Sequence, residues 1–137
     1  MSDKSEVQPL KRLLLVDDDH AVRMTLGKVM RLKGFSVTYA IQGEEALALF
    51  DQLDGQFELI ITDICMPEMN GDELMREIRQ RNKAIPMIAI TGYAEPKLLS
   101  KVSSYDALLF DKPLNLEAMM AYIDSIFPPM SPCAAYK

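Results

Sequence analysis

Short apolar runs alternate along the chain with longer segments in which apolar residues recur at helical spacing. The runs are apolar or rich in β-forming residues, and they occupy residues 11–16, 35–40, 57–62, 86–90 and 107–110. The first run contains Leu13-Leu14-Leu15-Val16 without an intervening polar residue. Such unbroken runs are typical of strands that are covered on both faces. The pattern therefore predicts five β-strands.

Apolar residues three or four positions apart predict a helix after each strand. In residues 21–33 the apolar face consists of Val22, Leu26, Val29 and Met30, and Gly34 follows as a C-terminal stop. The same spacing predicts helices over residues 43–53, 71–81, 96–104 and 116–127. Strands and helices that alternate in this way favour an α/β fold, with a parallel sheet covered by helices on both faces.

The length and composition fit one globular domain. The chain has 137 residues, of which 49% are hydrophobic and 26% are charged. We expect the domain to span residues 11–127, after a flexible leader at residues 1–10. Residues 128–137 begin with Pro128-Pro129 and are expected to be a tail or the start of a linker.

Charge and hydropathy narrow the classes of partner. The net charge of −5 disfavours a broad nucleic-acid surface, so we expect no direct nucleic-acid contact. No apolar run approaches the roughly 18 residues of a membrane span, and residues 1–8 contain no signal-peptide core. Cys65 and Cys133 fit no metal-binding spacing, which indicates reduced thiols in a cytoplasmic protein.

Charged or hydroxyl residues follow four of the predicted strands. In chain order they are Asp17-Asp18-Asp19, Asp63, Thr91 and Lys112. Because the carboxyl ends of parallel strands lie at one edge of a sheet, these side chains should converge there. Each feature alone is a weak signal, since an Asp after a strand is usually a turn residue. Their joint occurrence at four strand ends indicates a site.

Crowded carboxylates need a positive partner. Mg²⁺ takes a few carboxylate ligands and keeps several waters, and Lys112 adds a compact positive charge. Such a site can bind a phosphoryl group, to which the Thr91 hydroxyl can donate a hydrogen bond. Asp63 is the best placed acceptor, because Asp17 and Asp18 are better used as metal ligands. Asp19 is expected to cap the first helix.

The sequence resembles the receiver domain of two-component response regulators over about residues 11–127. Asp17 and Asp18 match the metal-binding acidic pair of that family. The phosphoacceptor motif is matched in type and spacing by Asp63, Met66, Pro67 and Gly71. Thr91-Gly92 matches the hydroxyl position, and Lys112-Pro113 matches a pair whose peptide bond is typically cis.

The resemblance implies a flavodoxin-like, doubly wound parallel sheet of five strands in the order 2-1-3-4-5. Five helices complete its three α/β/α layers. It also implies that Asp63 accepts a phosphoryl group from a sensor histidine kinase or a histidine phosphotransfer domain. Mg²⁺ would be bound by Asp17, Asp18, Asp63 and the backbone carbonyl of Cys65. The domain would not be an enzyme beyond catalysing its own phosphorylation and dephosphorylation.

The resemblance also implies how the domain signals. Thr91 and Lys112 would hold the phosphoryl oxygens, and the movement of Thr91 would alter the face formed by the fourth helix, fifth strand and fifth helix. A downstream effector would bind that face. Phosphorylation then biases an equilibrium between two states that exist beforehand.

One position departs from the family pattern. Receivers commonly carry Tyr or Phe three residues before the Lys, where this sequence has Leu109. Phe110 is adjacent, but a shift of one residue in a strand points to the opposite face. The output would then depend on Thr91 and loop movement, or the protein would mainly carry phosphoryl groups. Cys65 and Tyr93 lie two residues beyond Asp63 and Thr91, where they could tune dephosphorylation or simply pack in turns.

Three other functions fit parts of the pattern. A receiver-like scaffold that is never phosphorylated would bind proteins only. A phosphohydrolase of the haloacid dehalogenase type also uses an Asp nucleophile and Mg²⁺, but Ala21 stands where its motif has Thr. A flavodoxin-like cofactor module would need a phosphate-binding loop after the first strand, where three acids would repel an anion.

Overall fold

The computed structural model describes residues 10–65, 71–92 and 95–128. It is built around one parallel sheet of five strands in the order β2-β1-β3-β4-β5. The strands are β1 (Lys11–Val16), β2 (Phe35–Ala40), β3 (Leu59–Asp63), β4 (Met87–Thr91) and β5 (Leu108–Asp111). The predicted parallel sheet and its strand order are thus confirmed.

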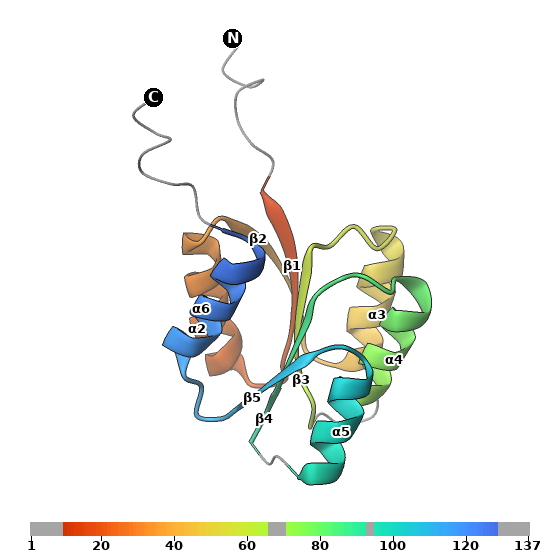
Figure 1. The fold of residues 1–137 in the computed structure, drawn as a ribbon. Coiled ribbons are helices and arrows are strands. Elements are labelled where there is room, and N and C mark those ends of the chain that lie inside the picture. Colours follow the sequence, from red (N-terminus) through yellow and green to blue (C-terminus); the bar gives the residue numbers. More distant parts are fainter. Residues whose placement is uncertain (1–9, 66–70, 93–94, 129–137) are drawn as a thin grey trace.

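Helices cover both faces of the sheet (Figure 1). One face packs against α2 (His20–Leu32) and α6 (Leu116–Ile126). The other packs against α3 (Gly43–Gln52), α4 (Gly71–Arg81) and α5 (Pro96–Ser104). The domain therefore has the three α/β/α layers that the sequence led us to expect.

The central strands are buried on both faces, which explains their unbroken apolar runs. Leu14 and Ile60 face the core under α3 and α4, whereas Leu13 and Ile61 face the core under α2 and α6. All four are fully buried. Because alternate residues serve different cores, a central strand here has no solvent-facing side and no reason for polar alternation.

The termini of the elements follow local rules. Asp19 is the N-cap of α2, and its carboxylate accepts hydrogen bonds from the backbone N–H groups of Ala21 and Val22 at 2.9 and 3.3 Å. This confirms the predicted cap. Gly34 has φ of 99°, in the left-handed region that favours glycine after a helix.

The strand ends differ from the predicted ones in a way that matters for the site. β3, β4 and β5 each extend by one polar residue, to Asp63, Thr91 and Asp111. The register pairs Asp63 with Ile90, and Thr91 with Asp111. Backbone pairing does not depend on side-chain polarity, so the sheet continues where the apolar pattern stops. The ladder consequently fixes the backbones of Asp63 and Thr91.

Candidate functional site

The carboxylates predicted to converge do so at the carboxyl edge of the sheet. Asp17 directly follows β1 and is fully buried, and Asp63 ends β3 with only 4% of its surface exposed. The exposed Asp18 lies next to them. Asp17, Asp18 and Asp63 each offer an oxygen, and these oxygens all lie within 4.8 Å of one another.

Lys112 provides the positive charge beside this cluster. Its Nζ lies 3.1 Å from Oδ2 of Asp63 and 3.5 Å from Oδ2 of Asp17. The backbone N–H of Lys112 donates to the carbonyl of Thr91 at 2.7 Å, and the Lys112–Pro113 peptide bond is cis, as the resemblance implies. Burial works to lower the pKa of Lys112. The hydrogen bond and charge of Asp63, with a further contribution from Asp17, outweigh that effect and raise the pKa.

The donor set fits a hard divalent cation. Oδ1 of Asp17 accepts a hydrogen bond from the Asp19 N–H at 2.8 Å, whereas the buried Oδ2 has no hydrogen bond within the described part of the chain and has only the longer ion pair with Lys112 at 3.5 Å. A buried carboxylate oxygen without a hydrogen bond is unfavourable, and a cation at the cluster would satisfy it. Three carboxylates beside one ammonium also leave a net negative site, which suits Mg²⁺.

The acidity of Asp17 reflects this environment. Burial is the largest influence and raises the pKa of Asp17, and the Asp63 charge adds to it. The hydrogen bond from the Asp19 N–H and the Lys112 charge oppose the rise. The resulting pKa is about 6, above the ordinary value of 3.8.

Neutralising Asp17 is therefore expected to stabilise the metal-free domain at neutral pH. Between about pH 4 and pH 6 the folded state binds the Asp17 proton more tightly than the unfolded state, so wild-type stability falls as pH rises through this range. The penalty is full above the folded pKa and amounts to roughly 3 kcal/mol. Asp17→Asn should remove it, as urea denaturation in EDTA at pH 5 and pH 7.5 would measure.

The control for this prediction is Asp111→Asn, which neutralises an exposed carboxylate at the same edge of the sheet. It should change the free energy of unfolding by less than about 0.5 kcal/mol. Equal pH dependence in wild-type and Asp17→Asn would mean that Asp17 is not the group whose pKa is raised.

Thr91 and Cys65 complete the surroundings of Asp63. The backbone N–H of Cys65 donates to Oδ1 of Asp63 at 3.1 Å. The exposed Cys65 thiol lies 3.9 Å from the buried Thr91 hydroxyl, and either group could be the donor. The structure thus brings Cys65 and Thr91 close to the Asp63 carboxylate. Pro67 and Tyr93, which the sequence also indicated, lie outside the described residues.

Gly71 holds the start of α4 against the site. Its N–H donates to the Ile64 carbonyl at 2.9 Å. A Cβ atom on Gly71 would lie 2.2 Å from the Asp63 carbonyl oxygen and 2.7 Å from the Ile64 Cα. Both neighbours are backbone atoms of the strand and turn that carry Asp63. Only glycine therefore permits this close approach.

The structure supports the interpretation of Leu109 and Phe110. Leu109 packs against the core under α3, α4 and α5, whereas Phe110 packs against the core under α2 and α6. The two side chains thus lie on opposite faces of β5. Phe110 therefore does not lie on the face of β5 from which Leu109 projects.

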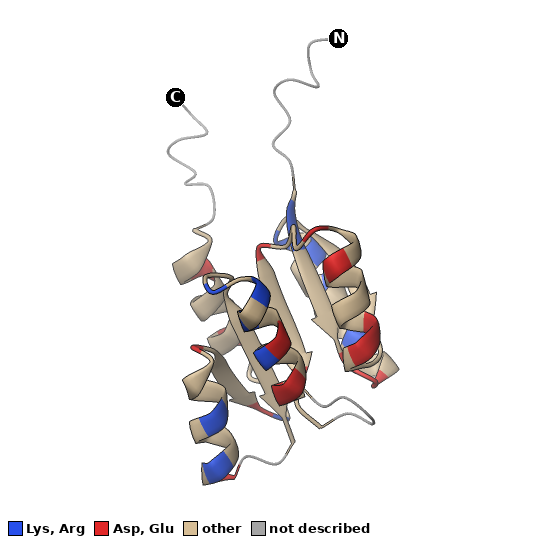
Figure 2. Cartoon of the chain, turned by 90° about the vertical axis from the view of Figure 1, so that its right-hand side faces the viewer, with Lys and Arg blue, Asp and Glu red and all other residues tan. Residues whose placement is uncertain are grey.

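Two contacts near the site were not foreseen from the sequence. Asp72, at the start of α4, is 8% exposed and pairs with Lys101 of α5 at 2.9 Å. Figure 2 shows this side of the molecule, with both signs of charge along α4 and basic residues on α5. Arg23 of α2 donates to the backbone carbonyl of Asp17 at 2.7 Å. Neither of these two contacts could be inferred from the sequence, because none of the side chains that make them belongs to a recognisable motif.

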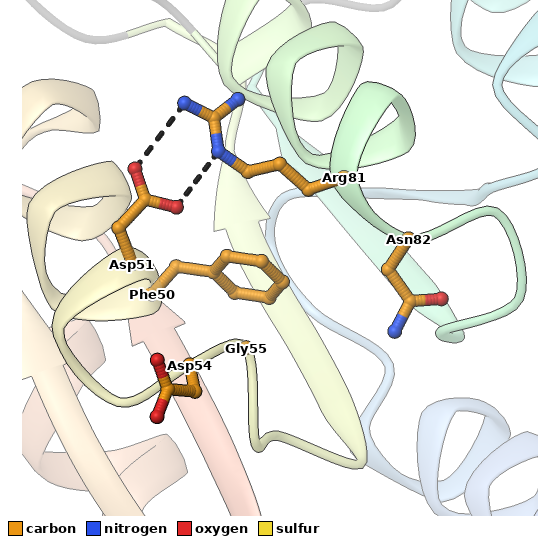
Figure 3. A pocket seen from close by; sticks show the side chains of 6 residues that line it. All are labelled: Phe50, Asp51, Asp54, Gly55, Arg81 and Asn82. Atoms are coloured by element: carbon orange, nitrogen blue, oxygen red, sulfur yellow. Dashed lines mark hydrogen bonds and ion pairs between the residues drawn. The ribbon is translucent and has the colours of Figure 1, made fainter.

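A hollow of about 250 Å³ lies away from this chemistry, at the amino edge of the sheet (Figure 3). It lies between the C-terminal ends of α3 and α4. The guanidinium of Arg81 faces it and binds both carboxylate oxygens of Asp51, at 2.7 and 3.2 Å. This pair links two helices across the hollow and has no contact with the acidic cluster.

The fold and site define an open, doubly wound α/β domain with an acidic cluster and a lysine at the carboxyl edge of its sheet. The chain belongs to the response regulator receiver domain family, which it matches over residues 13–124. It is thus a receiver domain of two-component signalling, as its motifs predicted. Domains of this kind bind Mg²⁺ at an acidic pocket and are usually not classical enzymes.

Named relatives agree with this assignment. The chain is 40% identical to the sensor kinase CckA of Brucella abortus over 83 residues, which are 61% of this chain and 9% of that protein. It is 32% identical to the response regulator MprA of Mycobacterium sp. (strain KMS) over 124 residues, 88% of this chain and 52% of MprA. The chain therefore spans about half the length of MprA and less than a tenth of the length of CckA.

A solved structure is similar throughout the fold. It is the CheY-like response regulator receiver domain protein of Methanospirillum hungatei, with a TM-score of 0.78 and 29% identity. The match covers 85% of this chain and 93% of that one. Among the described residues, no helix is long and apolar enough to span a membrane.

Proposed function

We propose that Asp63 accepts a phosphoryl group from a phosphohistidine on a sensor histidine kinase or a histidine phosphotransfer domain. The observation that carries this proposal is the position of the Asp63 carboxylate. It lies at the carboxyl edge of the sheet, among the acidic cluster and 3.1 Å from the Lys112 ammonium. Phosphoryl transfer depends mainly on positioning and charge stabilisation, and this arrangement offers both.

In the proposed reaction a carboxylate oxygen of Asp63 attacks phosphorus. The new O–P bond forms as the P–N bond to the partner's histidine breaks, and a ring protonated on its other nitrogen leaves as neutral imidazole. Lys112 then binds a phosphoryl oxygen in place of the Asp63 oxygen, and the Thr91 hydroxyl donates to another. Mg²⁺ held by Asp17, Asp18, Asp63 and the Cys65 carbonyl would supply further positive charge to the phosphoryl oxygens.

We also propose that the domain catalyses its own dephosphorylation. Water attacks phosphorus, the O–P bond breaks, and the Asp63 carboxylate and inorganic phosphate are released. The Cys65 thiol lies 3.9 Å from the Thr91 hydroxyl, so its size would influence the access of that water. Tyr93 is proposed for the same role from its position in the sequence.

The proposed output surface is formed by α5, β5 and α6, where a downstream effector would bind. Thr91 ends β4, the strand next to β5, and its carbonyl accepts a hydrogen bond from the Lys112 N–H. A shift of the Thr91 backbone would therefore also move the β5–α6 connection. With Leu109 in place of an aromatic residue, the response would depend on Thr91 and the loops around it.

The wild-type domain is expected to take up one phosphoryl group from acetyl phosphate when Mg²⁺ is present, and none in EDTA. The reason is that Asp17, Asp18 and Asp63 repel the anionic donor unless a cation neutralises them. Intact-mass spectrometry would detect the adduct, and hydroxylamine should remove it because an acyl phosphate is labile. Restoring Mg²⁺ after EDTA serves as the control.

Three other results would argue against the proposal. Equal uptake in EDTA would exclude a metal-dependent site. No adduct from acetyl phosphate or from any phosphohistidine donor would favour a protein-binding scaffold that is never phosphorylated. Turnover of many phosphoesters would indicate a hydrolase.

A further inference from the structure

We propose that Arg23 is a positioning residue for the acidic cluster, and that it sets the affinity of the cluster for a divalent cation. The inference rests on the proposed Mg²⁺ site and adds a residue that does not itself touch the cation or the phosphoryl group. Arg23 lies in the first turn of α2, directly after the loop that carries Asp17 and Asp18.

The contact that carries the inference is made to the backbone. The guanidinium Nη1 of Arg23 donates to the carbonyl oxygen of Asp17 at 2.7 Å, in partly buried surroundings. This carbonyl belongs to the peptide unit that joins Asp17 to Asp18. The Nη2 atom lies 3.4 Å from Nδ1 of His20, which places the guanidinium between the loop and the start of the helix.

The other described contacts of the loop hold the backbone on both sides of Asp18, but not the Asp18 side chain. The Asp17 N–H donates to the Ala40 carbonyl at 3.1 Å, and its Oδ1 accepts from the Asp19 N–H at 2.8 Å. The exposed Asp18 side chain has no hydrogen bond or ion pair within the part of the chain that the structure describes. The peptide unit that Arg23 binds is therefore one of the restraints that set the backbone position from which the Asp18 side chain projects.

Physical chemistry explains why such a hold is needed. The carboxylates of Asp17, Asp18 and Asp63 repel one another when no cation is bound, and Asp18 can relieve the repulsion by turning toward solvent. A guanidinium that holds the preceding carbonyl leaves the side-chain bonds of Asp18 free to rotate, but it limits movement of the backbone that carries Asp18, because its planar set of donors is rigid. The ligands are then already in place when the cation arrives, and less ordering is needed on binding.

The charge of Arg23 acts in the opposite direction. A guanidinium close to the cluster repels an incoming cation, so removing it would strengthen Mg²⁺ binding if charge alone mattered. Positioning predicts weaker binding after the same change. The sign of the effect therefore decides between the two roles.

The test is calorimetric titration of the full chain with Mg²⁺. In Arg23→Met, which keeps an unbranched apolar side chain but has no donor or charge, the Kd for Mg²⁺ should rise about 10-fold. Arg23→Lys, which restores one donor and the charge, should recover part of the affinity. The matched control is Lys28→Met, which removes one positive charge from the exposed side of the same helix and should change the Kd by less than about twofold.

Two further readouts separate positioning from a general loss of structure. The Mg²⁺ concentration that gives half-maximal phosphorylation should rise by the same factor in Arg23→Met, while the rate at saturating Mg²⁺ stays near that of wild type. Without metal, hydrogen exchange at the Asp19 amide, which is bonded to Asp17, should become faster. The amides of β4 should exchange as in wild type.

An Arg23→Met protein that binds Mg²⁺ as tightly as wild type, or more tightly, would overturn this inference and leave the proposed function intact. A wild-type chain that takes up a phosphoryl group without binding Mg²⁺ would overturn both the positioning role and the metal site.

Discussion

An Asp63→Asn variant is expected to take up no phosphoryl group from acetyl phosphate under conditions in which the wild-type domain takes up one. An amide has no anionic oxygen to attack phosphorus, whereas the neighbouring Lys112 and the acidic pair remain in place. In the wild-type protein the Cys65 N–H and the Lys112 ammonium each lie 3.1 Å from a different Asp63 oxygen. Asn has nearly the same shape, and its single side-chain oxygen can still accept from one of these two donors. The fold should therefore persist, and circular dichroism would verify this alongside intact-mass measurement.

The matched control is Asp111→Asn. Asp111 is exposed, and it ends the neighbouring strand β5 at the same edge of the sheet. This variant should be phosphorylated like wild type, because Asp111 is outside the acidic cluster. A hydroxylamine-labile phosphoryl group on the Asp63→Asn protein would show that another carboxylate is the acceptor.

Replacing Gly71 with alanine is expected to destabilise the domain by about 3 kcal/mol, the upper end of the usual overpacking penalty. The added Cβ would lie 2.2 Å from the Asp63 carbonyl oxygen, and that oxygen belongs to a backbone fixed by pairing with β4. Neither side can move without breaking the sheet or shifting the start of α4. Urea denaturation followed by circular dichroism would measure the loss.

Gly92→Ala provides the control. It makes the same substitution next to Thr91, where an added Cβ would meet no atom of the described residues within 4 Å. It should change stability by less than about 1 kcal/mol, since only the entropy of the unfolded chain is affected. If Gly71→Ala unfolds at the same urea concentration as Gly92→Ala, the close approach of α4 to β3 does not exist in solution.

The sequence was sufficient for the fold because its signals are local and repeated. Unbroken apolar runs such as residues 13–16 predicted buried parallel strands, and the Asp19 cap and the Gly34 stop followed from residue type and position alone. The errors are at strand ends. Residues 57–58 were predicted to belong to a strand, but β3 begins at Leu59, and the N–H of Phe57 donates to the Gly55 carbonyl instead of to a neighbouring strand.

The candidate site could be predicted for a different reason. Parallel topology brings all strand ends to one edge, so the order of residues along the chain was enough to place Asp17, Asp63, Thr91 and Lys112 together. The contacts of Asp72 with Lys101, and of Arg23 with the Asp17 carbonyl, could not be predicted. Both contacts are made by long side chains that extend from one element to another. The spacing of residues in a single sequence does not indicate which group such a side chain will contact.

The two ends of the described domain meet on the side of the molecule remote from Asp63 (Figure 1). Phe127 packs edge-on against Phe35 with ring centroids 5.5 Å apart, and the Lys11 ammonium lies 5.9 Å from the centre of the Phe127 ring. A polypeptide joined before Lys11 or after Phe127 would therefore depart from the edge opposite the acidic cluster. Further polypeptide attached at either end would therefore leave the acidic cluster accessible to a partner protein.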